Sequence, residues 1–349
     1  MANAVNFVWN YCNETSFNCI RNKSKWLSEF ELNNLTAGCS KELGIPSATI
    51  QAICKEYVGC RRKAKKRKLA WRSKKRSLGW IPIKSTRFSL KNDSIKYALH
   101  YFRFWKSRDI IGKLTTANFS QDSRGRWYIN IDCETDTYFF QKTKNEIGID
   151  LGLKTLASDS NGKKYSRENL TKKYESKLSM AQRAKKKKLV KTINAKIKNS
   201  RKDWAHKTTI QIIRENDLIV VGNVKSEKLK KTQFAKSVSD AGWYQFKSLL
   251  AYKAIRFGKE YKEVKENFST VTCSICLNKA DVGGLSNLGV REWTCSVCGT
   301  VHDRDTNAAK NILRFGHESL KGIPLMGRMS SSISRGVDTI AGLKTSMLK

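Results

Sequence analysis

Long hydrophobic segments are missing from this sequence. No run approaches the roughly 20 apolar residues that a membrane-spanning helix needs. Residues 1–20 also lack the basic start and the uninterrupted apolar segment of a secretory signal peptide. We therefore expect an intracellular, cytoplasmic protein with no membrane partner.

Acidic residues are scarce relative to basic ones. The 349 residues include 30 Asp and Glu against 68 Lys and Arg, which gives a net charge of +38. This excess is spread along the chain, and a folded protein carrying it unpaired would be strained by its own repulsion. Polyphosphate neutralises such charge while releasing counterions, which favours binding. The composition predicts a nucleic-acid partner, and the charge is larger than solubility alone requires.

Cysteines are present, but their pattern does not favour a disulfide scaffold. The chain is long and 40% of its residues are hydrophobic, so it can fill real cores. Six cysteines are scattered among apolar residues, as buried free thiols are in a reducing compartment: Cys12, Cys19, Cys39, Cys54, Cys60 and Cys133. The other four form two Cys-x-x-Cys pairs, which match tetrahedral coordination of one structural zinc ion: Cys273, Cys276, Cys295 and Cys298.

The character of the sequence changes several times along the chain. Helical spacing of apolar residues gives way to strand-like alternation, then to a mixture of both, and finally to a segment rich in Gly and Ser. We expect a multidomain α/β protein with these parts: a helical domain at 1–77, a small β-barrel at 78–143, an α/β domain at 144–272 that includes a basic helix at 167–216, a zinc ribbon at 273–300, a final helix at 301–316 and a disordered tail at 317–349.

Basic residues adjoin aromatic ones at the end of the helical domain. Charges that suit phosphate there lie beside a ring that can stack on a base. The candidates for nucleic-acid binding in this tract are Arg61, Arg62, Lys65, Lys66, Arg67, Lys68 and Trp71. Further candidates come from the basic helix and from the loop after the strand at 218–221: Lys185, Lys186, Lys225, Lys228 and Lys230.

Two carboxylates stand at positions that suit catalytic metal ions. Asp150 ends an apolar strand between Gly148 and Gly152, and these glycines would let a phosphate backbone come close. Asp305 begins the final helix in the segment DRDTNAAKN. Two-metal phosphodiester cleavage needs several Asp or Glu oxygens around a pair of hard cations. The structural alternatives are a turn cap for Asp150 and a helix N-cap for Asp305.

Several segments together resemble the transposon-encoded OrfB/TnpB family of RNA-guided nucleases, which are akin to type V CRISPR effectors and to Fanzor proteins. They are GIDLGLKTLAS, LIVVGNV, AKSVSDAGWYQFKSLLAYKA and REWTCSVCGTVHDRDTNAAKNIL, and the resemblance runs from about Phe7 to Arg314. It implies a RuvC-like nuclease domain of RNase H fold with an inserted zinc ribbon, a recognition domain at 1–77 and a wedge-like barrel at 78–143. It also implies a guide RNA and target double-stranded DNA as partners, two Mg²⁺ ions, and a prokaryotic cytoplasm with binding to the nucleoid. A partner transposase encoded nearby is a further implied partner.

Asp150 and Asp305 match the first and third catalytic carboxylates of that family, but the second is missing from its usual place. Gly222 follows the strand at 218–221, and glycine has no side chain to bind a metal. Glu266 ends the next predicted strand, and paired strands lie only about 4.8 Å apart, so it reaches the same cluster if the two strands pair. A subset of the family looks similar, with Gly or Pro at the second position and a compensating Glu downstream. Glu292 is another candidate for the missing second carboxylate, and we rank it below Glu266.

Three functions follow from these observations. The first is an RNA-guided DNA endonuclease that uses Asp150, Glu266 and Asp305. The second is a nuclease-dead, RNA-guided transcriptional repressor, which the glycine at 222 would explain. The third is a guide-independent zinc-ribbon protein that assists transposition. The presence of both aspartates and all four zinc-type cysteines favours the enzyme. We expect His302 to be structural because the cysteine quartet is complete without it.

Overall fold

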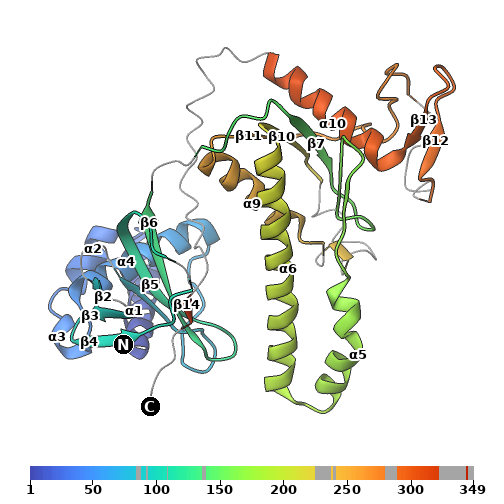
Figure 1. Ribbon diagram of the computed structural model, residues 1–349. Helices are drawn as coiled ribbons and strands as arrows, with labels where there is room; N and C mark the ends of the chain where they lie inside the picture. Colours follow the sequence, from blue (N-terminus) through green and yellow to red (C-terminus); the bar gives the residue numbers. More distant parts are fainter. Residues whose placement is uncertain are drawn as a thin grey trace. The chain divides into compact units, whose positions relative to one another are not determined.

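The computed structural model describes residues 1–83, 88–91, 93–107, 109–135, 139–224, 237–238, 241–279, 289–321 and 343–344. The chain divides into two compact units, Met1–Asp136 with Ser334–Lys349 and Thr137–Ile333. Both contain helices and sheets (Figure 1). The multidomain α/β class predicted from the sequence is confirmed. None of the helices in the described ranges is long and apolar enough to cross a membrane.

The first unit begins with helices that are well specified by local sequence. They are α1 (Ala2–Lys23), α2 (Glu29–Leu35), α3 (Ser40–Leu43) and α4 (Ser47–Ala64). Ser28 caps α2 in a capping box, in which the Ser28 hydroxyl accepts from the backbone N–H of Glu31 and the Glu31 carboxylate accepts from that of Ser28. Ile50, Ile53 and Tyr57 form the buried stripe of α4, so this helix packs by one face.

Two antiparallel sheets follow the helices in the first unit. One has the order β1-β5-β6-β14 and the other β2-β3-β4. Their strands are β1 (Trp80–Ile83), β2 (Phe88–Lys91), β3 (Ser94–Tyr97), β4 (His100–Arg103), β5 (Lys113–Gln121), β6 (Trp127–Glu134) and β14 (Leu343–Lys344). In the described ranges they form two separate hydrogen-bonded sheets rather than the expected single barrel. One hydrophobic core includes Tyr57 of α4 together with Ile81 and Ile129 of the sheet, so the boundary expected at residue 77 does not divide two cores.

The second unit is built on a five-stranded mixed sheet with the order β11-β10-β7-β8-β9. Strand β10 pairs in parallel with both β7 and β11, whereas β8 and β9 are antiparallel. The strands are β7 (Glu146–Asp150), β8 (Ala157–Asp159), β9 (Lys164–Tyr165), β10 (Leu218–Gly222) and β11 (Glu260–Val264). A two-stranded sheet of β12 (Glu292–Thr294) and β13 (Val301–Asp303) lies in the cysteine-rich segment.

The helices of this unit correct two expected boundaries. They are α5 (Leu170–Arg183), α6 (Lys187–Glu215), α9 (Trp243–Arg256) and α10 (Arg304–Lys321). The single helix expected at 167–216 is two helices, because the chain turns at Lys185 with a φ of 51°. The expected tail at 317–349 begins inside α10, and residues 343–344 pair with β6. Residues 322–342 and 345–349 lie outside the described ranges.

Strand alternation divides the buried side chains of β10 between two helical layers. Ile219 and Val221 share a core with residues of α6 and α9, while Leu218 and Val220 share a core with Ile312 of α10. Figure 1 shows α10 running along this sheet on the side opposite α9 and α6. Helix α10 therefore covers one face of the sheet, and side chains at the end of β7 that point to this face lie near α10.

Gly148 has a different role from the one expected. A Cβ at Gly148 would lie 2.1 Å from the carbonyl oxygen of Ala309, so the glycine lets α10 pack directly on β7. A Cβ at Gly152 would lie 2.7 Å from the carbonyl oxygen of Thr155. Both glycines are thus required by contacts within the protein, and the predicted opening for a phosphate backbone is not found at either.

Candidate functional site

The three predicted catalytic carboxylates are presented at the carboxyl end of the parallel strands. Asp150 ends β7 and shares the α10 side of that strand with Gly148, two residues earlier. Asp305 lies in the first turn of α10. Glu266 follows β11 by two residues, and β11 pairs in parallel with β10 so that Gly222 is opposite Val264. The strand pairing on which the Glu266 prediction depended is therefore present.

Glu266 occupies the space that a side chain at position 222 would need. A Cβ built on Gly222 would lie 2.7 Å from Oε2 of Glu266 and 3.5 Å from its Cβ. The carboxylate of Glu266 consequently lies where a short side chain from the end of β10 would begin. This is a direct spatial relation between the residue that is missing from the family pattern and the residue predicted to replace it.

The electrostatics of Asp150 reflect both neighbouring carboxylates. Burial, and then the negative charges of Glu266 and Asp305, raise the pKa of Asp150 to about 8, against the opposing charges of Arg304 and Arg291. Both Glu266 and Asp305 thus act on Asp150 as like charges. We call these three side chains the carboxylate cluster.

Glu266 is short of hydrogen-bond donors. Burial raises the pKa of Glu266, although the charge of Lys247 opposes this shift. Its Oε2 atom is buried and has no hydrogen-bond partner among the described residues. Carboxylate oxygens in this condition fit a hard divalent cation such as Mg²⁺, which prefers oxygen ligands. The carboxylate oxygens are not gathered as tightly as the cysteine sulfurs described below.

Asp305 does not cap α10. The capping residue is Asp303, whose Oδ1 accepts from the backbone N–H of Thr306 at 2.9 Å and whose other oxygen contacts Lys164. The side chain of Asp305 instead contacts the guanidinium of Arg291 at 3.2 Å. The N-cap alternative for Asp305 is therefore wrong, and its carboxylate contacts the side chain of Arg291 instead of the backbone of α10.

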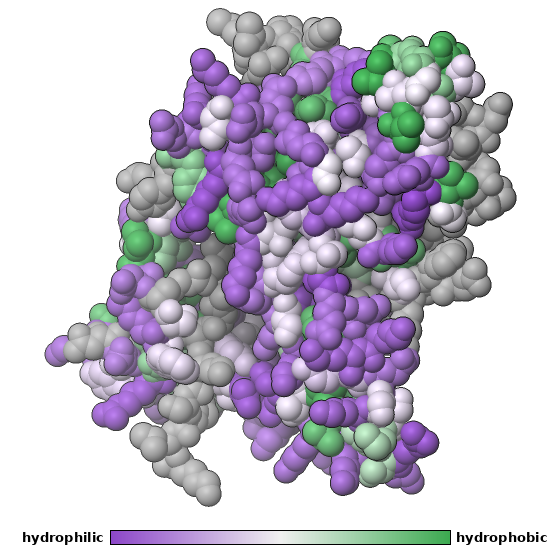
Figure 2. Space-filling model, turned by 45° about the vertical axis from the view of Figure 1, so that its right-hand side comes forward, coloured by the Kyte–Doolittle hydropathy of each residue, from purple (hydrophilic) through white to green (hydrophobic). Residues whose placement is uncertain are grey.

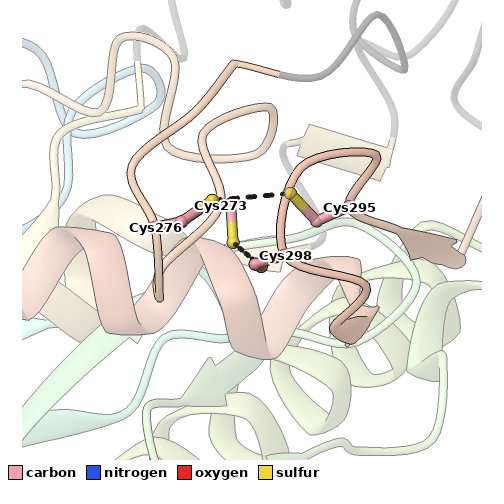
Figure 3. Close-up of side chains that lie close together, drawn as sticks. All are labelled: Cys273, Cys276, Cys295 and Cys298. Carbon is pink, nitrogen blue, oxygen red and sulfur yellow. Dashed lines mark hydrogen bonds between the residues drawn. The ribbon is translucent and has the colours of Figure 1, made fainter.

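The four predicted zinc ligands converge. Their sulfur atoms all lie within 4.8 Å of one another, with 3.6 Å between Cys273 and Cys298 and 3.5 Å between Cys276 and Cys295 (Figure 3). Each pair sits in a tight turn, closed by hydrogen bonds from Leu277 N–H to the Cys273 carbonyl and from Gly299 N–H to the Cys295 carbonyl. Four sulfurs in this arrangement fit zinc.

His302 contacts the quartet from outside. Its Nε2 lies 3.1 Å from Sγ of Cys273, and its ring lies 4.7 Å from that of Trp293. A hydrogen bond to a ligand sulfur orients the ligand and tunes its basicity. This contact agrees with the structural role predicted for His302.

Two asparagines that the sequence analysis missed connect the cysteine segment to α10. The side-chain amide of Asn311 donates to the carbonyls of Thr272 at 2.7 Å and Ser269 at 2.9 Å, and Asn307 also donates to Thr272 at 2.8 Å. Oδ1 of Asn307 accepts from the N–H of Ser274. Segment 269–274 joins Glu266 to the first cysteine pair, so these bonds fix it against the helix that carries Asp305. The available signal was two Asn residues four apart on an otherwise apolar helix face.

The nucleic-acid candidates divide into three groups. Arg61 is buried, donates to the Ser16 hydroxyl and the Leu27 carbonyl, and lies 4.5 Å from the Trp26 ring centre. Its prediction as a phosphate contact is therefore corrected. The exposed candidates are Arg62, Lys65, Lys66, Arg67, Lys68, Trp71, Lys185 and Lys186. The loop candidates Lys225, Lys228 and Lys230 lie outside the described residues. The face in Figure 2 is mainly hydrophilic, in keeping with the net charge.

The fold and the candidate site define an α/β protein in which a four-cysteine knuckle adjoins a carboxylate cluster. Residues 133–233 match the family model OrfB_IS605, described as a probable transposase, and residues 243–312 match the Cas12f1-like TNB domain. These matches confirm the resemblance to the OrfB/TnpB family that the sequence predicted.

Two curated relatives illustrate this similarity. A protein named "Putative RNA-guided DNA endonuclease" from Streptomyces pristinaespiralis is 34% identical over 216 residues, covering 58% of this chain and 53% of the relative. A protein named "Putative RNA-guided DNA endonuclease InsQ" from Escherichia coli K12 is 28% identical over 251 residues, covering 64% and 61%. The chain thus spans between half and two thirds of the length of each. The chain in a cryo-EM structure of a Cas12f1, sgRNA and target DNA complex is 16% identical, with a TM-score of 0.40 over 88% of this chain and 91% of that chain.

Proposed function

We propose that this protein is an RNA-guided DNA endonuclease of transposon origin, with a RuvC-like active site formed by Asp150, Glu266 and Asp305. The observation that carries the proposal is the position of Glu266, whose carboxylate occupies the space beside Gly222. A chain that had only lost its second carboxylate would have no reason to place another acid there with a buried, unpartnered oxygen. The names of the curated relatives support the same activity.

The carboxylate cluster would hold two Mg²⁺ ions, which when bound activate water and stabilise the leaving oxygen of a phosphodiester. Asp150, with a pKa of about 8, keeps its proton near neutral pH until a cation offsets the charges of its neighbours. Arg291, 3.2 Å from Asp305, supplies positive charge where a DNA phosphate would approach.

The cysteine quartet would hold one zinc ion with a purely structural role. Four sulfur ligands complete a tetrahedral shell and leave no position for a reacting water. Asn307 and Asn311 connect this knuckle to α10 through segment 269–274. The zinc would therefore stabilise the positions of Glu266 and Asp305 without taking part in the reaction.

Guide RNA and target DNA would be the partners of the basic surface. In RNA-guided recognition, base pairing supplies sequence specificity and the protein holds the hybrid through its backbone. Exposed basic residues at 62–68 and at the turn between α5 and α6 suit that task. In this proposal the helices and sheets of the first unit hold RNA and read the duplex beside the target.

The test is cleavage of a plasmid in Mg²⁺ by protein purified with its co-expressed RNA. We expect Glu266→Gln to lose at least about 100-fold in rate while guided DNA binding is retained. Glu292→Gln is the matched control, because Glu292 is an exposed acid on β12, and it should cleave normally. Guided binding without cleavage by the wild type would instead establish the nuclease-dead repressor. Equal binding of duplex DNA with and without RNA would establish the guide-independent protein.

A further inference from the structure

An open groove lies within the first unit, between α1 and the segment 71–74. It encloses about 530 Å³, within the range of about 300–1,000 Å³ that is typical of sites for small ligands. Its lining includes Phe7 and Tyr11 from α1 and Trp71 from the other segment, together with Lys74 and Glu14. None of the residues predicted for catalysis or zinc binding lies in this groove.

The wall of the groove that carries Trp71 is held rigidly. Nδ2 of Asn10 donates to the Arg72 carbonyl and its Oδ1 accepts from the Arg72 N–H, both at 2.8 Å. Asn13 makes the same pair of bonds with the backbone of Leu69, at 2.9 and 3.0 Å. Each amide thus satisfies both backbone groups of one residue, as a neighbouring strand would. The extended segment is fixed on α1 at two points on either side of Trp71.

This arrangement keeps aromatic rings in contact with solvent. Trp71 is 55% exposed, Phe7 is 60% exposed and Tyr11 is 38% exposed. Phe7 and Tyr11 are four residues apart on α1, so they lie on one face of the helix. Large aromatic side chains gathered on a rigid, exposed wall mark a binding surface more often than a defect of packing.

The polar groups around the rings indicate which ligand fits. Basic residues of the 61–76 tract precede and follow Trp71, which favours a polyanion. The carboxylate of Glu14 also lines the groove, where it contacts Lys68 at 2.5 Å. A carboxylate accepts hydrogen bonds, so it suits a base amino group or a ribose hydroxyl rather than a bare phosphate. Deoxyribose lacks that hydroxyl, and the ring faces of a duplex are covered by stacking.

We propose that this groove binds an unpaired nucleotide of RNA, with its base stacked on Trp71 and flanked by Phe7 and Tyr11. The proposal rests on the proposed function in taking RNA as a partner, and it adds a site for a single-stranded portion of that RNA. Aromatic stacking of this kind tolerates any base, because every base has a π-face.

The experiment uses the full-length protein and a short oligouridylate that carries one 2-aminopurine, whose fluorescence falls when it stacks. We expect the wild type to bind and quench it. Trp71→Ala should weaken binding about tenfold, as the loss of one stacking contact does, and should remove the quenching, whereas Trp71→Phe keeps most of both. Phe30→Ala is the matched control, because Phe30 is 72% exposed on α2 of the same unit, and it should behave as the wild type.

Each alternative outcome overturns the proposal. Unchanged binding by a Trp71→Ala protein with a native circular-dichroism spectrum and melting temperature would exclude the groove. A deoxy oligomer that binds as tightly would exclude the assignment to RNA, and equal binding of the fully paired probe would exclude an unpaired base. The assay contains neither guide nor Mg²⁺. If the protein fails to cleave plasmid but its oligouridylate binding depends on Trp71, the proposed endonuclease activity is refuted and the proposed nucleotide site in the groove is retained.

Discussion

Oε2 of Glu266 lies 2.7 Å from the position that a Cβ on Gly222 would take. Positions 222 and 266 therefore compete for one place, and only one of them can carry a side chain there without displacement. The glycine and the glutamate are best understood as a matched pair across β10 and the end of β11.

Exchanging the two residues tests this relation. Gly222→Glu alone should slow cleavage by at least about tenfold, because crowding displaces the carboxylate and small misplacements are costly to catalysis. The double variant Gly222→Glu with Glu266→Gly removes the crowding and should regain part of the lost rate in the same plasmid assay. Full activity of the single variant, or a double variant no better than Glu266→Gly alone, would contradict the pairing.

Loss of the zinc ion should disorder the cysteine segment, because the proposed role of zinc is structural. Cys295→Ser breaks a buried ligand of the quartet, so bound zinc, expected at about one ion per chain in the wild type, should fall toward zero. We expect segment 273–303 to become sensitive to limited proteolysis, as measured by mass spectrometry of the fragments. Cys133→Ser, which changes a free thiol on β6, should leave both zinc content and proteolysis unchanged. Wild-type zinc content in Cys295→Ser would exclude the quartet as the site.

Asn311 should matter for stability and for cleavage. Asn311→Ala removes a donor shared by the buried carbonyls of Ser269 and Thr272, and losing such bonds costs about 1–3 kcal/mol. Urea unfolding measures this loss, and cleavage should fall more than guided binding because segment 269–274 follows Glu266. Asn194→Ala is the control, since Asn194 is exposed on α6. An Asn311→Ala protein as stable as the control would show that Asn307 alone holds the segment.

Ionisation of Asp217 should make the free energy of unfolding depend on pH. Burial alone would raise its pKa, but hydrogen bonds from Lys259 and from the backbone of Lys144 and Thr143 lower it to about 2. A lowered pKa stabilises the folded protein above the ordinary value near 4, and this contribution disappears as pH falls through 2.

Asp217→Asn should therefore cost about 1–2 kcal/mol at pH 6, a range reduced for the screening of a carboxylate that is 25% exposed. The difference from the wild type should vanish near pH 2 in thermal melts. Asp203→Asn, on the exposed side of α6, should change little at either pH. A constant difference across this range would show that the effect does not come from ionisation.

The sequence predicted the parts of the site that follow from local order. A strand end places Asp150, a helix start places Asp305, and the spacing of paired cysteines predicts the quartet. Glu266 needed one further condition, parallel pairing of its strand with β10, and that pairing is present. These placements in the fold agree with the structure because they depend on which residues end an element and not on how distant elements pack, while the catalytic roles of the three carboxylates stay predictions.

The predictions that failed concern packing between elements. Arg61 was assigned to phosphate by its neighbours in the basic tract, yet it follows Tyr57 by four residues and so continues the buried stripe of α4. Gly148 was assigned to a ligand, whereas its contact is Ala309 of α10, far away in the sequence. Periodicity shows that a face is buried, but the partner that covers it emerges only in three dimensions.

The packing of α10 on β7 also has a consequence for the order of events during synthesis. The ribosome completes Asp150 and its strand long before residues 305–313 emerge, and until then the face of β7 that contains Gly148 has no cover. The carboxylate cluster lacks Asp305 until the first turn of α10 has been made. Any nuclease activity would thus be withheld until the residues of α10 have been synthesised.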